Sequence, residues 1–264
     1  MSAYRTSTPA SRWFPYRQPG AAPALRLFCF PYAGGTAMVY RSWAAALPAG
    51  VEVMAVQLPG RGARLLEEPL HRIGDVVRAV VPVLLPFLDC PFAFFGYSMG
   101  ALVAFETARA LRAMQQALPE KLFVAACRGP QREAARNTRR HDLPLPELIA
   151  ELERLNGTPR EILNDPAALE CFLPALRADF EVVDTYVYQA AGPLACPIQA
   201  FGGVDDDVSV EDLSAWGDHT SSGFSLEMLD GDHFFILQSA EALLERVRRA
   251  LAPLTAGRDL FINA

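Results

Sequence analysis

The residues with the clearest chemical signature are Gly96-Tyr97-Ser98-Met99-Gly100, which form a G-x-S-x-G motif between an apolar run, 91–95, and a helical pattern, 101–116. A strand that turns sharply into a helix lifts a serine hydroxyl above the sheet edge, where a histidine and a substrate can both reach it. The flanking glycines suit this turn because a Cβ would crowd the strained backbone. We therefore predict that Ser98 is a nucleophile. The alternative is a serine in an ordinary strand–helix turn.

A general base for this serine must come from the histidines. Active sites built on this motif carry their groups in the chain order serine, carboxylate, histidine. His141, His219 and His233 follow Ser98. We predict His233 as the base, because it lies on a loop after the last apolar strand pattern and can swing over the nucleophile. His219 stands at a polar helix end, where we expect a solvated or capping residue, and His141 stands in an arginine-rich stretch.

The carboxylate should follow the next-to-last predicted strand, 196–201, after which Asp205, Asp206 and Asp207 occur in succession. Such a carboxylate accepts the imidazole N–H, fixes the tautomer and stabilises the imidazolium. We choose Asp205 because it is the first carboxylate beyond the strand, and Asp206 remains the second choice. The alternative for all three is a solvated acidic turn, since neighbouring buried charges would repel and lose solvation.

Two backbone N–H groups should face the negative oxygen that develops during acyl transfer, forming an oxyanion hole. The first is expected from Met99, the residue after the nucleophile. The second is expected from Ala33, in the loop Pro31-Tyr32-Ala33-Gly34-Gly35 that follows the apolar run 25–30. The paired glycines let this backbone approach a ligand closely. A plain glycine turn is the alternative interpretation of the same residues.

Apolar runs and helical patterns alternate along the chain. Short, near-continuous apolar runs are typical of strands in a parallel sheet that helices cover on both faces. We therefore predict a single α/β domain over 1–264 with a mostly parallel central sheet. The candidate catalytic residues then meet at the carboxyl ends of the strands. The predicted strands are 25–30, 51–57, 92–97, 121–127, 196–201 and 224–229, and the predicted helices lie near 38–47, 71–88, 99–116, 209–217 and 237–251.

The interval of about 128–190 interrupts this alternation. Its patterns are helical, at 145–156, 166–176 and 179–188, and it contains no convincing strand pattern. A helical insertion after a core strand, on the side where the catalytic residues gather, predicts a lid over the site. The alternative is a helical subdomain that only extends the core.

Composition limits the partners and the compartment. The chain has 264 residues, of which 51% are hydrophobic, and its net charge of −6 argues against nucleic acid as the main partner. No apolar run reaches the ~18 residues of a membrane span, and the N-terminal stretch lacks a signal-peptide pattern. The five cysteines have no metal-ligand spacing, so we expect no metal site and small buried thiols in a reducing cytoplasm.

Five motifs in the same order resemble those of the type II thioesterases, stand-alone α/β-hydrolases that serve nonribosomal peptide and polyketide synthases. The resemblance covers about 14–251. It implies the α/β-hydrolase fold, a monomer, and hydrolysis of stalled or incorrect acyl groups from the phosphopantetheine arm of an acyl or peptidyl carrier protein. The serine mechanism requires no cofactor. Tyr32 and Tyr97 depart from the family, whose members often carry histidine at both positions. The motifs are Phe30-Pro31-Tyr32-Ala33-Gly34-Gly35, Gln57-Leu58-Pro59-Gly60-Arg61-Gly62, Phe95-Gly96-Tyr97-Ser98-Met99-Gly100-Ala101, Gly202-Gly203-Val204-Asp205 and Gly231-Asp232-His233-Phe234-Phe235.

The densest basic run, at the start of the 128–190 interval, is the candidate carrier-binding surface, because carrier proteins are usually acidic. We select Arg136, Arg139 and Arg140 from it. A basic rim would steer the partner and weaken with salt, and the alternative is a solvated charged loop. For the function itself the alternatives are a medium-chain acyl thioesterase, a small-molecule esterase, or a binding protein without activity. The intact Ser98 and His233 argue against the last.

Overall fold

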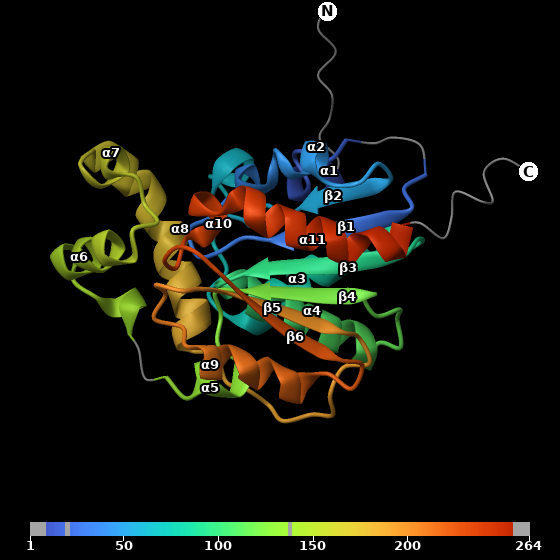
Figure 1. The fold of residues 1–264 in the computed structure, drawn as a ribbon. Helices are drawn as coiled ribbons and strands as arrows, with labels where there is room; N and C mark the ends of the chain where they lie inside the picture. Colours follow the sequence, from blue (N-terminus) through green and yellow to red (C-terminus); the bar gives the residue numbers. More distant parts are fainter. Residues whose placement is uncertain (1–8, 19–21, 137–138, 256–264) are drawn as a thin grey trace, which may run out of the picture.

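A computed structural model describes residues 9–18, 22–136 and 139–255. Its centre is a sheet of six strands (Figure 1), in the order β2-β1-β3-β4-β5-β6. All neighbouring strands are parallel. The strands are β1 (Leu25–Phe30), β2 (Val51–Ala55), β3 (Phe92–Tyr97), β4 (Lys121–Ala125), β5 (Ile198–Gly203) and β6 (Phe224–Leu229).

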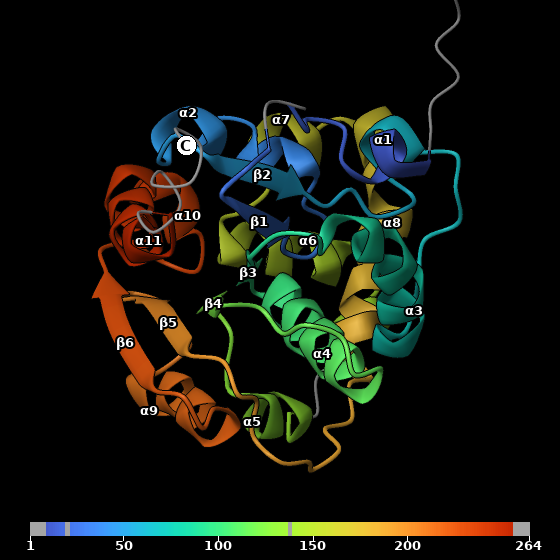
Figure 2. The ribbon, with the colours of Figure 1, turned by 90° about the vertical axis from the view of Figure 1, so that its right-hand side faces the viewer.

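Helices cover both faces of this sheet (Figure 2). On one face, α3 (Ile73–Leu84) and α4 (Met99–Ala113) pack against β-strand phenylalanines, and on the other face α2 (Trp43–Ala46) and α11 (Ala240–Thr255) do the same. Every residue of β3 is buried, because both faces of this central strand are covered, and this explains its unbroken apolar sequence. The predicted fold class, a mostly parallel sheet with helices on both faces, is confirmed.

Short helical segments connect these elements, and several of them are 3-10 helices, marked η. They are α1 (Pro9–Trp13), η1 (Ala37–Tyr40), η2 (Gly62–Arg64), η3 (Leu85–Phe87), α9 (Val210–Ser214), η5 (Ala215–His219) and α10 (Phe235–Gln238).

The described residues between β4 and β5 form five further helical segments, and α6 and α7 extend beyond one end of the sheet, at the left of Figure 1. The segments are α5 (Pro130–Ala134), η4 (Arg140–Asp142), α6 (Leu145–Leu155), α7 (Arg160–Leu163) and α8 (Pro166–Asp184). We call residues 128–190 the helical segment.

One helix, α8, replaces the two helices predicted at 166–176 and 179–188. It starts at the N-cap Asp165, whose carboxylate accepts the N–H of Ala167, and it carries Pro166 at its first position, where proline is favoured. The residues between the two predicted helices favour helix. Leu169, Leu176 and Phe180 pack in one cluster with leucines of α6 and α7, so a continuous apolar side holds the helix in place.

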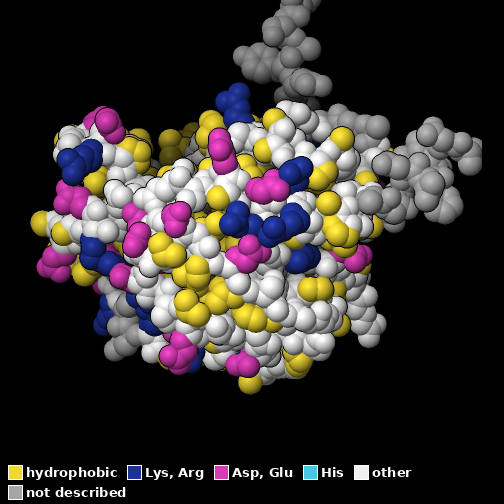
Figure 3. Space-filling model, in the orientation of Figure 1, with side chains coloured by type: hydrophobic (Ala, Val, Ile, Leu, Met, Phe, Trp, Pro, Cys, Tyr) yellow, Lys and Arg dark blue, Asp and Glu magenta, His cyan; other side chains and the backbone are white. Residues whose placement is uncertain are grey.

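The face of the molecule in Figure 3 carries acidic and basic side chains interspersed, so opposite charges lie near one another there. Within the described residues, every helix is too short or too polar to cross a membrane.

Candidate active site

Ser98 lies in the tight turn between β3 and α4. Its φ of 53° and ψ of −119° are angles that residues other than glycine rarely adopt. The surrounding backbone holds this conformation: the Ser98 N–H donates to the Ala125 carbonyl at 2.8 Å, and the Ser98 carbonyl accepts the Ala101 N–H at 2.9 Å. A Cβ on Gly100 would lie 2.1 Å from the Phe30 carbonyl oxygen. Only glycine fits there, which is why the motif ends on one.

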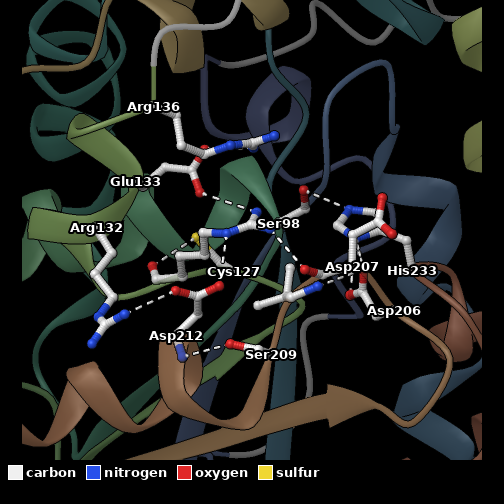
Figure 4. Close-up of polar contacts among 12 residues, drawn as sticks. Ser98, Cys127, Arg132, Glu133, Arg136, Asp206, Asp207, Ser209, Asp212 and His233 are labelled. Atoms are coloured by element: carbon white, nitrogen blue, oxygen red, sulfur yellow. Dashed lines mark hydrogen bonds and ion pairs between the residues drawn. The ribbon is translucent and has the colours of Figure 1, made fainter.

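Side chains that follow strands β3, β5 and β6 form a hydrogen-bonded chain (Figure 4). The Oγ of Ser98 lies 3.0 Å from Nε2 of His233, and Nδ1 of His233 lies 3.0 and 3.1 Å from the two carboxylate oxygens of Asp206. The Asp206 side chain is only 2% exposed. In such an arrangement the imidazole can accept the serine proton while the carboxylate fixes the orientation of the ring.

The structure places Asp206 against the imidazole, so the choice of Asp205 as its partner is wrong. Strand β5 runs to Gly203, two residues beyond its predicted end. The backbone pairing then continues, because the Asp205 N–H donates to the Gly231 carbonyl at 3.0 Å. The turn that directs a carboxylate toward the imidazole therefore comes one residue later than expected, and Asp205 remains exposed.

Two histidines and the third aspartate lie apart from this chain of hydrogen bonds. His219 is buried and bonded to Gln131, so the expectation of a solvated or capping residue is wrong. Burial lowers the pKa of His219. Nδ1 of His141 lies 2.9 Å from a carboxylate oxygen of Asp184, and Asp207 is exposed.

Tyr97 fastens the loop that carries His233. Its buried hydroxyl donates to the His233 carbonyl oxygen at 2.7 Å and accepts the Ile236 N–H at 3.2 Å. Burial raises the pKa of Tyr97 well above its usual value, so the hydroxyl stays protonated and remains a donor. The sequence marked Tyr97 only as a departure from a family pattern, and its position next to Ser98 was the one signal of this role.

The loop after β1 brings Ala33 to the same site. Ala33 and Met99 both line a cavity with Ser98, and among the described residues neither backbone N–H donates to a protein acceptor. Both N–H groups are therefore available to a ligand. An oxyanion hole requires two such free donors.

A buried ion pair fixes this loop to the helical segment. Asp179, on α8, accepts the Gly34 N–H at 2.7 Å. The same carboxylate binds Arg61 through two nitrogens, with Nη2 2.8 Å from Oδ1. Both side chains are buried. Asp179 therefore joins three distant parts of the chain, and Arg61, which the sequence marked only by its motif, is one of its partners.

Two cavities meet at Ser98. The larger, of about 600 Å³, lies beside α6, α7 and α8 and is lined mostly by apolar side chains, among them Phe172 and Leu176. The smaller, of about 120 Å³, is lined mostly by polar and charged groups. Ser98 and His233 line both cavities. A substrate bound at the serine can therefore extend one part into an apolar space and another into a polar one.

The arginines selected as a carrier-binding surface occupy three different environments. The Arg139 side chain is 75% exposed and forms an ion pair with Asp142. Arg136 is partly exposed and binds Glu133 at 3.1 Å. The Arg136 and Glu133 side chains lie across Ser98 from the imidazole in Figure 4. The Arg140 side chain is 16% exposed and lines both cavities. The three arginines do not form one exposed patch, because Arg140 belongs to the site.

Comparison with known proteins supports a common origin for the whole of this fold. Residues 25–251 match the model of the thioesterase domain family. The gramicidin S biosynthesis protein GrsT of Aneurinibacillus migulanus is 42% identical over 248 residues, which are 92% of this chain and 96% of that protein. The medium-chain S-acyl fatty acid synthase thioesterase of Rattus norvegicus is 33% identical over 230 residues, which are 84% of this chain and 85% of that protein.

A solved structure shows the same similarity in three dimensions. The type II thioesterase BorB from the borrelidin biosynthetic cluster superposes with a TM-score of 0.81 at 38% sequence identity, and the match covers 89% of this chain and 96% of that chain.

Proposed function

Because this chain belongs to the thioesterase domain family, we propose that it is a stand-alone editing enzyme that removes stalled or incorrect acyl and aminoacyl groups from carrier proteins of nonribosomal peptide or polyketide synthesis. The chain is a hydrolase that acts on thioesters, and its fold is the α/β-hydrolase fold of its relatives. The names of GrsT and BorB attach those two proteins to biosynthetic clusters, and this is the support for the editing role.

The observation that carries the proposal is the hydrogen-bonded chain Ser98–His233–Asp206. In the proposed cycle, His233 removes the Ser98 proton as the serine oxygen attacks the thioester carbonyl. Asp206 holds the imidazolium that forms. The imidazolium gives its proton to the departing pantetheine sulfur, which leaves as the thiol. The neutral His233 then takes a proton from water, which attacks the acyl-enzyme, and it returns that proton to Ser98 as the acid is released.

The developing negative oxygen needs hydrogen-bond donors that are already in place. We assign this role to the backbone N–H groups of Met99 and Ala33, which line the cavity at Ser98. The tie between Gly34 and Asp179 supports the assignment, because it holds the Ala33 loop at a fixed distance from the nucleophile.

The proposed partner is an acyl or peptidyl carrier protein, acted on by a monomeric enzyme in the cytoplasm. Cys29, Cys127 and Cys196 are buried free thiols, which suits a reducing compartment. Of the three arginines first selected for docking, we retain the exposed Arg139 as a carrier contact. The helical segment serves as the lid, since its α8 and α6 side chains line the larger cavity.

The test compares a propionyl thioester on a phosphopantetheinylated carrier protein with the same acyl group on free pantetheine. We expect a kcat/KM advantage of at least about tenfold for the carrier substrate, which corresponds to about 1.4 kcal/mol of docking. Ser98→Ala should lower turnover by several orders of magnitude, whereas the exposed Ser214→Ala should not. Equal rates on both substrates would remove the carrier protein from the proposal.

A second candidate is a thioesterase for medium-chain acyl groups. The apolar cavity of about 600 Å³ supports it, as does the similarity to the rat medium-chain enzyme. The same assay with octanoyl and decanoyl thioesters separates the two functions. A strong preference for these chains over propionyl would favour the second candidate.

A further inference from the structure

Arg140 differs from the other arginines that line the smaller cavity. Each of the three others hydrogen-bonds a carboxylate: Arg128 to Asp212 at 3.0 Å, Arg136 to Glu133 at 3.1 Å and Arg154 to Glu151 at 2.8 Å. Within the described residues, Arg140 donates no hydrogen bond to any protein group. Its nearest carboxylate oxygen, on Asp184, lies 3.5 Å from Nε.

The carboxylate nearest to Arg140 is already engaged. One oxygen of Asp184 accepts both the backbone N–H of His141 at 3.0 Å and a contact from its imidazole Nδ1 at 2.9 Å. The guanidinium of Arg140 instead lies over the ring of Phe180, 4.9 Å from its centroid. Stacking on an aromatic ring orients a guanidinium and leaves its in-plane donors free for a ligand.

This arrangement is costly for the protein alone. The Nε atom of Arg140 is buried without a hydrogen-bond partner, and its long ion pair with Asp184, at 3.5 Å, returns only part of the solvation that this atom loses. Burial lowers the pKa of Arg140, and the neighbouring charge of Arg136 lowers it further against the opposing effect of Asp184. Such an unsatisfied buried donor calls for an explanation, and a negatively charged ligand in the cavity supplies one.

We propose that Arg140 binds a carboxylate on the acyl group of the substrate, so that the smaller cavity accepts short acyl groups that end in a carboxylate, such as malonyl. This rests on the proposed thioesterase function. The cavity adjoins Ser98 and Met99 directly, and the carboxylate of a malonyl thioester is only two bonds from the carbonyl carbon that the serine attacks. An arginine fork matches a carboxylate through two parallel hydrogen bonds.

The phosphate of the phosphopantetheine arm is the other anion on such a substrate. It is separated from the thioester sulfur by the whole pantetheine chain, so a phosphate at Arg140 would leave the carbonyl far from Ser98. The smaller cavity, at about 120 Å³, also has no room for an extended arm. The geometry therefore favours the acyl carboxylate over the phosphate.

The test measures kcat/KM for malonyl and propionyl groups, each on pantetheine and on phosphopantetheine. Arg140→Gln should lower the malonyl-to-propionyl ratio of kcat/KM by about 10- to 100-fold, the range expected for a hydrogen bond to a charged group. Arg154→Gln is the matched control: it lines the same cavity but is bonded to Glu151, so it should not alter the malonyl-to-propionyl ratio.

Three results would overturn the proposal. A loss that follows the phosphate rather than the acyl group would reassign Arg140 to the arm of the substrate. An equal loss on all four substrates, or no loss on any, would leave Arg140 with a structural role only. The Tm of the variant reports on folding, and Arg140→Lys, which keeps the charge, should retain part of the malonyl preference.

A binding measurement separates this proposal from the proposed function. In a Ser98→Ala background, malonyl-pantetheine should raise Tm more than propionyl-pantetheine does, and Arg140→Gln should abolish the difference. If the wild-type enzyme hydrolyses no thioester, the thioesterase function fails on its own. If malonyl and propionyl groups stabilise the protein equally, the carboxylate site fails.

Discussion

Replacing Tyr97 with phenylalanine removes one hydroxyl that holds the His233 loop in place. The hydroxyl bonds the His233 carbonyl at 2.7 Å and the Ile236 N–H at 3.2 Å. The variant leaves both backbone groups without this partner in a buried place, at a cost of about 1–3 kcal/mol for each unsatisfied group. If about 1.4 to 2.7 kcal/mol of this cost disfavours the imidazole orientation that catalysis needs, kcat falls by about 10- to 100-fold.

The assay follows thiol release from propionyl-pantetheine, together with Tm. Tyr186→Phe is the matched control, because its buried hydroxyl donates a bond of the same length, 2.7 Å, to Glu106. That carboxylate keeps its bond to Arg109. We expect both variants to lose stability, but only Tyr97→Phe to lose kcat, with KM within about twofold of the wild type because the acyl-binding residues are unchanged.

The pH dependence adds a second check. Because burial keeps the pKa of Tyr97 well above its usual value, the hydroxyl remains protonated across the range of about pH 6 to 9, below the ordinary tyrosine pKa of about 10. The ratio of wild-type to variant kcat should therefore be constant over that range. A variant with unchanged kcat and a lowered Tm would refute the positioning role, and so would an equal loss of kcat in the Tyr186 control.

Three further substitutions test the site and the scaffold. Asp206→Asn should lower kcat by about 10⁴-fold, the loss expected when the carboxylate no longer fixes the imidazole tautomer. Asp205→Asn should lower kcat by less than about threefold. The reverse order would mean that Asp205 is the carboxylate that supports His233. Gly100→Ala should prevent folding or lower Tm sharply, because its Cβ would lie 2.1 Å from a β1 carbonyl oxygen, while Gly192→Ala has no atom within 4 Å of the new Cβ and should leave Tm unchanged. Arg61→Met should cost about 3–5 kcal/mol in urea unfolding, since it leaves its carboxylate partner on α8 buried and unpaired; a cost below about 1 kcal/mol would mean that the pair contributes little.

The juxtaposition of Ser98 and His233 could be predicted because the signals of both residues are local. The motif around Ser98 contains its own turn glycines and adjoins its own strand and helix. His233 was singled out by chain order and by the strand before it. The strands of the sheet could be predicted because each is an apolar run that can be recognised without knowing which strands pair with it. The predicted bounds of β1, β3 and β6 agree with the structure.

The rest depends on contacts between distant residues. Asp206 was ranked second because the end of β5 is set by its pairing with the chain beyond β6, which a single run of residues does not reveal. Arg140 was grouped with Arg139 by sequence. Only the packing of η4 against α8 separates a buried guanidinium from an exposed one. The continuity of α8 likewise depends on its leucine contacts with α6 and α7.

The shared carboxylate of Asp179 also bears on how such enzymes diversify. One side chain in the helical segment holds Gly34 near the nucleophile and Arg61 in the loop after β2. A chimera that receives a foreign segment in place of 128–190 must therefore carry an aspartate at the position that corresponds to 179. Without it, Arg61 is left buried and unpaired, and the Ala33 loop loses its hydrogen bond to the segment. The segment that lines the larger cavity and the loop that we assign to the oxyanion hole are thus inherited together, and recombination between family members is expected to succeed only where this register is kept.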